Sequence, residues 1–266
     1  GLFFPDGHCR TATGGACVSG NMLHIRDEGT GRPLVLIHGW SCPGRFFEGQ
    51  IEALKTDARC IVPDLPGHGL SSPLTGSGQG ALATGVGEAL DRVHDRPAVV
   101  VGYSLGGAGA VRYALRHPER VLGLFLLSPA GAPLDEAQLA ELRAVFALET
   151  HADAVAFVHR LRARPSWTAH LLAFDVLSRL KDPLLQRWIG EVSPEDFLTP
   201  VEAARVECPV QLVWGREEKI LPASGRDFYA KHLPDVELEE PEGWGHSAIL
   251  DDPSGLAMRI TRFAGR

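Results

Sequence analysis

Short apolar runs alternate with helical periodicity along the first and the last parts of the chain. The strand-like runs are separated by Gly, Pro and polar residues, and they cover residues 33–37, 60–62, 98–101, 121–127, 210–214 and 236–239. Apolar side chains recur at helical spacing over residues 80–94, 108–116, 223–232 and 254–263. Strand-like and helical segments therefore follow one another in turn, which is typical of strand–helix–strand units.

This alternation predicts an α/β fold with a mostly parallel central sheet and helices on both faces. Parallel strands need a crossover connection, and a helix packed on the sheet usually provides it. The segment that begins at Asn21 is expected to form an edge strand, and the first 17 residues, which lack periodicity, a loose arm. Ligands bind beside the carboxyl ends of the strands in such sheets, so the residues that directly follow strands are the candidates for chemistry.

The middle of the chain breaks the pattern. Four helical patterns and no strand signal occupy the stretch from residue 133 to residue 206. Thr199 and Glu202 form a capping-box pattern, and Pro200 stands at the first helical position. We therefore predict a core built from residues 1–132 and 207–266, and a helical cap over one edge of the sheet formed by residues 133–206.

Composition and charge narrow the range of partners. A formal net charge of −7 argues against nucleic acid as a partner, and the longest apolar runs are far shorter than the roughly 20 residues that span a bilayer. The five cysteines show no disulfide or zinc-site spacing, so we expect free thiols, although Cys9 and Cys17 are close enough in sequence to pair. We expect a cytoplasmic protein, with a secreted or periplasmic one as the alternative.

Residues 99–110, VVVGYSLGGAGA, place a serine between an apolar run and a helical segment. The glycines on both sides of Ser104 permit a sharp turn that would lift the hydroxyl above the sheet edge, beside a helix N-terminus. A Gly-rich turn without chemistry would explain the same letters. A serine that acts as a nucleophile also needs a base.

Three histidines follow strand or turn signals, and His246 is the best candidate for the base. It lies after the last predicted strand and just before the closing helix. His38 directly follows a strand, where we expect it to orient the loop, and His68 belongs to a PGHG turn. A surface or packing role is the alternative for any single histidine.

The base needs a carboxylate partner, and a developing oxyanion needs N–H donors. The loop after residues 210–214 reads GREEKILP, so Glu217 or Glu218 can supply the carboxylate, unless both simply lie in a solvated loop. The backbone N–H groups of Trp40, in the loop after residues 33–37, and of Leu105, next to the serine, are the candidate oxyanion donors.

The motifs occur in the order that is typical of the α/β-hydrolase fold superfamily, which the chain resembles from about residue 21 to residue 263. The motifs that carry the resemblance are HGW at 38–40, DLPGHGLS at 64–71, GYSLGG at 102–107, WGREEKILP at 214–222 and GH at 245–246. The resemblance implies Ser104 as nucleophile, His246 as base and Glu218 as acid, where the family more often has Asp. It places Asp64 in a structural turn.

The resemblance implies a serine hydrolase that cleaves a small-molecule carboxylic ester through an acyl-enzyme, with no metal and no organic cofactor. A carbon–carbon bond hydrolase or a lactonase is the alternative, and a non-catalytic ligand receptor is a further one. The large aromatic side chains of the cap are expected to form its own core, although some could line an acyl pocket; they are Phe146, Phe157, Trp167, Phe174 and Trp188. The sequence gives no indication of the oligomeric state.

Overall fold

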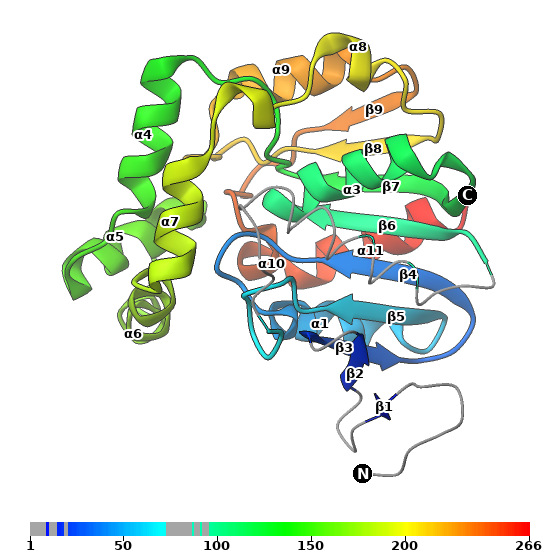
Figure 1. Cartoon of the computed structure of the whole chain (residues 1–266), viewed down its shortest axis with the longest axis horizontal. Coiled ribbons are helices and arrows are strands. Elements are labelled where there is room, and N and C mark those ends of the chain that lie inside the picture. The colour runs from blue at the N-terminus through cyan, green and yellow to red at the C-terminus, as the bar shows by residue number, and fades with distance from the viewer. Residues whose placement is uncertain (1–8, 11–14, 19–20, 73–86, 88–90, 92–95) are drawn as a thin grey trace.

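A computed structural model describes residues 9–10, 15–18, 21–72, 87, 91 and 96–266. The strands of these residues form one sheet in the order β1-β2-β3-β5-β4-β6-β7-β8-β9 (Figure 1). Their bounds are β1 Cys9–Arg10, β2 Gly15–Val18, β3 Asn21–Glu28, β4 Arg32–Ile37, β5 Ala58–Pro63, β6 Ala98–Tyr103, β7 Val121–Leu127, β8 Val210–Val213 and β9 Val236–Glu239.

The central part of this sheet is parallel, as predicted. From β5 through β4, β6, β7 and β8 to β9, every neighbouring pair runs in the same direction. All six residues of β6 are buried, which agrees with a strand that is covered on both faces. The predicted α/β fold class is therefore confirmed.

Alternate residues of the strands serve two separate cores. Val35, Val100 and Leu124 pack into one cluster with helix α3 (Leu105–Arg116) and helix α9 (Ala223–His232). The residues beside them, Leu34, Val99 and Phe125 among others, pack into a second cluster with helix α1 (Glu48–Leu54) and helix α11 (Pro253–Ala264). This two-residue period is the physical reason for helices on both faces of the sheet.

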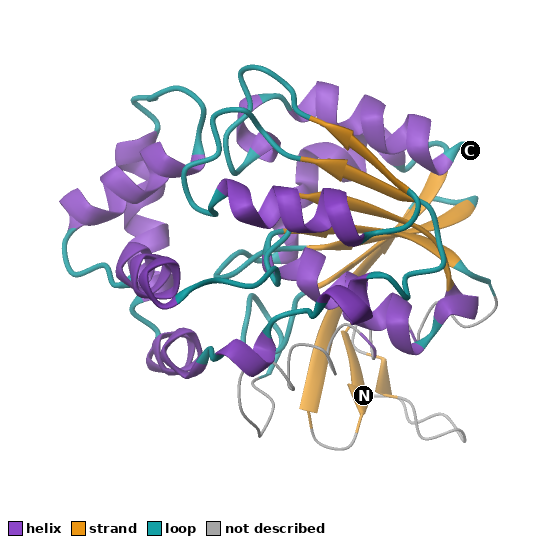
Figure 2. Cartoon of the chain, turned by 90° about the horizontal axis from the view of Figure 1, so that it is seen from above, coloured by secondary structure: helices purple, strands orange, loops and turns teal. Residues whose placement is uncertain are grey.

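The chain between β7 and β8 is helical and contains no strand in the described structure. Figure 1 and Figure 2 show α4 to α7 as a separate layer beyond the ends of the strands, and α8 lies next to α9. The bounds are α4 Glu136–Phe146, α5 His151–Leu161, α6 Ala169–Leu180, α7 Pro183–Glu191 and α8 Pro200–Ala203. The exact limits of the core and the cap, residues 132/133 and 206/207, remain a prediction.

Several helices in this region begin at a residue whose side chain caps them. The predicted capping box at Thr199 and Glu202 is present, with Pro200 at the first helical position. Asp135 with Gln138 starts α4 in the same way, and Thr150 starts α5. Helix α7, α1 and the short α10 (Ala248–Asp251) were not predicted from the sequence.

Two predictions for the first residues are wrong. The strand from Asn21 is not at the edge, because β3 pairs with β5 on one side and with β2 on the other. Part of the expected loose arm forms β1 and β2, whose register sets Cys9 opposite Cys17. Additional antiparallel strands give the backbone of β3 hydrogen-bond partners on both sides, and the sequence pattern does not reveal them.

Some expectations concern residues that the structure does not describe. Most of the predicted helix over residues 80–94 lies there.

Cys42, Cys60 and Cys208 are free thiols. None of the helices in the described ranges is long and apolar enough to cross a membrane.

Candidate functional site

Ser104 occupies a strained turn between β6 and α3. Its φ of 52° lies in a region that residues other than glycine rarely adopt. The flanking glycines are required by space: a Cβ on Gly106 would lie 2.3 Å from the carbonyl oxygen of Ile37, and one on Gly102 would lie 2.6 Å from the Cα of Gly107. The turn holds the hydroxyl at the carboxyl end of β6.

The imidazole of His246 lies against this hydroxyl. His246 stands in the loop between β9 and α10, and its Nε2 is 3.0 Å from the Oγ of Ser104. Its Nδ1 is 2.8 Å from the Oε2 of Glu218. With a carboxylate beside Nδ1, that nitrogen carries the proton, so Nε2 is left to accept a hydrogen bond from the serine hydroxyl.

The carboxylate of Glu218 is held by its own loop after β8. Its Oε1 accepts hydrogen bonds from the backbone N–H groups of Ile220 at 2.8 Å and Leu221 at 3.1 Å. Burial acts to raise the pKa of Glu218, but the adjoining His246 and these two N–H donors outweigh it, and the pKa lies below the ordinary value of a glutamate. The carboxylate is therefore kept ionised beside the imidazole.

The structure brings Ser104, His246 and Glu218 into one buried hydrogen-bonded chain. The side chains of His246 and Glu218 are 4% and 3% exposed, and Ser104 is 7% exposed. The neighbouring Glu217 does not join this chain. One of its carboxylate oxygens is buried and has no hydrogen-bond partner among the described residues.

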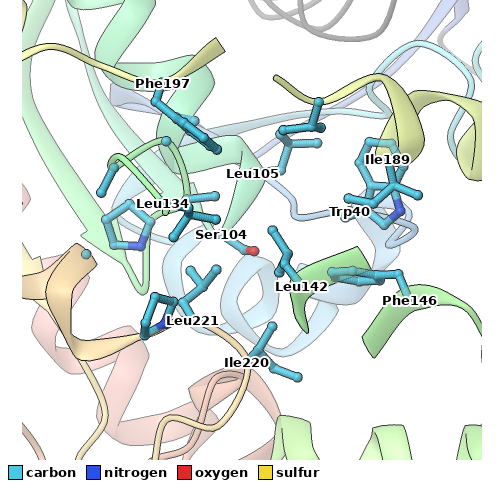
Figure 3. A pocket seen from close by; sticks show the side chains of 18 of the residues that line it. Trp40, Ser104, Leu105, Leu134, Leu142, Phe146, Ile189, Phe197, Ile220 and Leu221 are labelled. Carbon is cyan, nitrogen blue, oxygen red and sulfur yellow. The ribbon is translucent and has the colours of Figure 1, made fainter. Parts of the chain in front are cut away.

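The two residues with candidate oxyanion donors, Trp40 and Leu105, both lie near Ser104 (Figure 3). Leu105 is the first residue of α3, and Trp40 lies in the loop after β4. That loop approaches the serine closely, since a Cβ on Gly39 would lie 3.0 Å from the Cβ of Ser104. No acceptor within the described ranges takes a hydrogen bond from the backbone N–H of Trp40 or Leu105. Both groups are available to a ligand.

The other two candidate histidines support the loops around the site. His38 has its Nδ1 at the carbonyl of Gly39 and accepts a hydrogen bond from the N–H of Leu65 at Nε2. Burial lowers the pKa of His38 to about 4, and burial with the neighbouring His38 lowers the pKa of His68 to about 3. Both imidazoles are neutral, and neither has a hydrogen bond to Ser104.

Asp64 also stabilises the loops around the site. Its carboxylate accepts hydrogen bonds from the backbone N–H groups of Gly44 and Leu70 and lies 3.0 Å from the Nδ1 of His24. These three contacts link segments that are far apart in the sequence. This agrees with a structural role in the turn that follows β5.

Ser104 lines two cavities that are also bordered by residues of helices α4 to α7. One is bordered by residues of α3, α4 and α7 and by the loops after β7 and β8, and Figure 3 shows the Ser104 hydroxyl pointing into it. The other is bordered by His246, by Tyr103 and by residues of α5 and α6. The described residues contain no group of three or more side chains that could hold a metal ion.

The cap aromatics take different positions, so the expectation of a common core holds only in part. Trp188 is fully buried, Phe146 lines both cavities, and Phe157 lines the cavity beside His246. Trp167 and Phe174 are 77% and 67% exposed, so neither belongs to a core. Phe174 belongs to α6, and Trp167 lies in the turn just before that helix.

Two polar residues near the site were missed from the sequence. Arg179 of α6 lines the cavity beside His246 and donates a hydrogen bond to the carbonyl of Ser41. Asp251 accepts a hydrogen bond from the N–H of Gly245, the residue before His246. Arg179 lies within a helical pattern, and Asp251 lies in the DDP that precedes the closing helix; no local signal separates either from an ordinary surface charge.

Comparisons with known proteins agree with this architecture. A sequence profile described as the alpha/beta hydrolase fold matches residues 32–159. The pimeloyl-(acyl-carrier protein) methyl ester esterase of Chromobacterium violaceum is 30% identical over 239 residues, which cover 86% of this chain and 92% of that protein. The monoacylglycerol lipase abhd6-B of Xenopus laevis is 26% identical over 86% of this chain and 74% of that protein.

A solved structure is similar over nearly the whole chain. The structure of a meta-cleavage product hydrolase from Pseudomonas fluorescens covers 92% of this chain and 94% of its own, with a TM-score of 0.80. The two sequences are 22% identical. At that identity the similarity bears on the fold and not on the reaction.

Proposed function

The chain belongs to the α/β-hydrolase fold family as a carboxylic ester hydrolase, and on that premise we propose that Ser104, His246 and Glu218 are its catalytic triad. The hydrogen-bonded chain from Ser104 through His246 to Glu218 is the observation that supports this proposal. A serine hydroxyl is a weak nucleophile, and an imidazole at Nε2 with a carboxylate at Nδ1 is the arrangement that activates it.

The first half of the proposed reaction forms an acyl-enzyme. His246 Nε2 takes the proton of the Ser104 hydroxyl while Oγ attacks the ester carbonyl carbon. The N–H groups of Trp40 and Leu105 donate hydrogen bonds to the oxyanion of the tetrahedral intermediate. The carbon–oxygen bond to the alcohol then breaks, and the departing oxygen receives the proton from His246.

The second half releases the acid. A water molecule gives a proton to His246 Nε2 and attacks the acyl carbonyl, and the collapse of the second intermediate returns the proton to Ser104 Oγ. The products are a carboxylic acid and an alcohol. Glu218 remains ionised throughout and stabilises the imidazolium that forms in both halves.

The test is covalent labelling combined with turnover. Wild-type protein is expected to react with a fluorophosphonate at Ser104 and to hydrolyse a p-nitrophenyl ester, and Ser104→Ala is expected to lose both. Ser128→Ala is the matched control, because Ser128 is a second buried serine with a positive φ, 39°, and should keep both activities. Wild-type protein that takes no label and turns over no activated ester would overturn the proposal.

A substrate panel separates the alternatives within the same fold. Esters, lactones and a substrate with a hydrolysable carbon–carbon bond are compared by kcat/KM at matched size. An ester is expected to give the highest value. A carbon–carbon substrate that exceeds every ester would assign the triad to that reaction instead.

A further inference from the structure

We propose that the cavity away from His246 is the acyl site, and that it accepts an uncharged apolar acyl group and excludes one that ends in a carboxylate. This inference rests on the proposed ester hydrolysis and adds the substrate class.

Ser104 stands at the boundary between the two cavities. Trp40, Ser104 and Phe146 line both of them. A substrate whose carbonyl carbon is bonded to Ser104 Oγ therefore has space on two sides, one for the acyl chain and one for the alcohol.

The position of His246 indicates which cavity takes the alcohol and which takes the acyl group. His246 lines only one of the two cavities. The alcohol oxygen must receive its proton from His246 Nε2 when the ester bond breaks, so the alcohol lies in the cavity that contains His246. The acyl group, which stays on Ser104, is left with the other cavity, whose lining includes the proposed oxyanion donor residue Leu105.

The acyl cavity is lined by apolar side chains. Figure 3 shows Leu134, Leu142, Phe197, Ile220 and Leu221 around the Ser104 hydroxyl. They come from the cap and from the loops of the core, so the cavity is apolar on every side that the figure displays. Among the described lining residues there is no Asp, Glu, Lys, Arg or His.

A carboxylate in this cavity would lose its hydration without gaining a counter-charge. An ionised group moved from water into apolar surroundings carries a large free-energy cost unless it is paired. Trp40 offers an indole N–H that is buried and unpartnered among the described residues. One neutral donor leaves most of the hydrogen-bonding capacity of a carboxylate unmet.

The alcohol cavity differs in charge. It holds Arg179 in addition to His246. The guanidinium of Arg179 already contacts the carbonyl of Ser41 and the carboxylate of Asp175. The cationic group therefore lies on the alcohol side, where it does not compensate a charge at the far end of the acyl chain.

The experiment compares two esters of one alcohol whose acyl ends are alike in shape. They are the p-nitrophenyl ester of 6-methylheptanoic acid and the mono-p-nitrophenyl ester of hexanedioic acid, which end in an isopropyl group and a carboxylate. We expect kcat/KM to be about a hundredfold or more higher for the isopropyl ester. Equal values would overturn the acyl-site inference.

A matched pair of variants tests the location. Leu142→Arg places a cation in the lining of the acyl cavity, and it is expected to shift the ratio of the two kcat/KM values toward the carboxylate by about tenfold. Leu171→Arg adds the same charge on the cap, at a residue that is 63% exposed and lines neither cavity, and should leave the ratio unchanged. Identical shifts in both variants would place the acyl group elsewhere.

The outcomes separate this inference from the proposed function. If neither ester is hydrolysed and the fluorophosphonate does not label Ser104, the triad proposal fails. If both esters are hydrolysed equally well and the label is taken, the triad stands and the acyl-site inference fails. The wild-type comparison decides the inference even if Leu142→Arg does not fold.

Discussion

At the scale of single residues, the two carboxylate oxygens of Glu218 have different partners. Oε1 accepts hydrogen bonds from the N–H groups of Ile220 and Leu221, and Oε2 faces the Nδ1 of His246. The first pair fixes the carboxylate in its loop, and the second contact fixes the imidazole. The extra methylene of glutamate, compared with aspartate, is thus accommodated by a loop that binds the carboxylate through the oxygen that does not face His246.

Glu218→Gln is expected to lower kcat by about 10³–10⁴-fold with little change in KM. Glutamine keeps the size of the side chain but removes the negative charge that stabilises the imidazolium in the proposed mechanism, and its amide can present the wrong hydrogen-bonding group to Nδ1. Steady-state kinetics on an activated ester measure the loss, with circular dichroism to establish that the variant is folded.

Glu217→Gln is the control for this substitution. The two glutamates are neighbours in sequence, but Glu217 has no hydrogen bond to His246, so kcat should stay within about twofold of the wild-type value. Equal losses in the two variants would mean that the charge of the loop, and not the contact with His246, supports catalysis.

The sequence predicted that Ser104, His246 and the acid loop lie together, because each follows a strand whose carboxyl end lies at the same sheet edge, and the structure brings them into contact. The sequence was not sufficient to choose between Glu217 and Glu218 from the residues alone. Adjacent loop residues point in different directions, and the direction depends on backbone hydrogen bonds such as that from the Glu217 N–H to the Trp244 carbonyl. The resemblance favoured Glu218, and the geometry places Glu218 beside His246.

At the scale of elements, the turn between β6 and α3 depends on close backbone approach. Gly106→Ala is expected to reduce the free energy of unfolding by about 3 kcal/mol or more, because the new Cβ would lie 2.3 Å from the backbone oxygen of Ile37 and cannot be relieved by a side-chain rotation. The urea midpoint of unfolding measures this loss.

Gly190→Ala is the matched control within a helix. A Cβ at Gly190, near the end of α7, would meet nothing within 4 Å, so the substitution should be neutral or stabilise by up to about 1 kcal/mol. If Gly106→Ala unfolded at the same urea concentration as the wild type, the inference that the turn has no room for a Cβ at residue 106 would be wrong.

Periodicity predicted the elements better than it predicted their neighbours. The buried runs of β6 and β7 were evident, because a strand covered on both faces is continuously apolar. The placement of β3 inside the sheet was not evident, since its second neighbour, β2, comes from a segment without periodicity. Trp167 and Phe174 were expected in the core of the cap because apolar residues usually are buried, yet both are exposed.

At the scale of the whole molecule, the segment after α5 is linked to the loop that carries His246 by hydrogen bonds to the Asp251 carboxylate. Asp251 accepts hydrogen bonds from the N–H of Ala163 at 3.0 Å and from the N–H of Gly245 at 2.8 Å, and it is paired with Arg162. Gly245 has no room for a side chain, since a Cβ there would lie 2.6 Å from the nitrogen of Ala163. The position of His246, the proposed base, is therefore coupled to the packing of the segment that follows α5.

Asp251→Asn is expected to lower the free energy of unfolding by about 1.5–3 kcal/mol and kcat by about tenfold, because an amide cannot accept from both N–H groups and pair with Arg162 at once. Thermal unfolding and kinetics well below the transition temperature separate the two effects. Glu242→Gln, which breaks the exposed Arg216–Glu242 pair close to the same loop, should change neither quantity measurably. A variant that lost stability but kept the full kcat would show that Asp251 holds the cap without positioning His246.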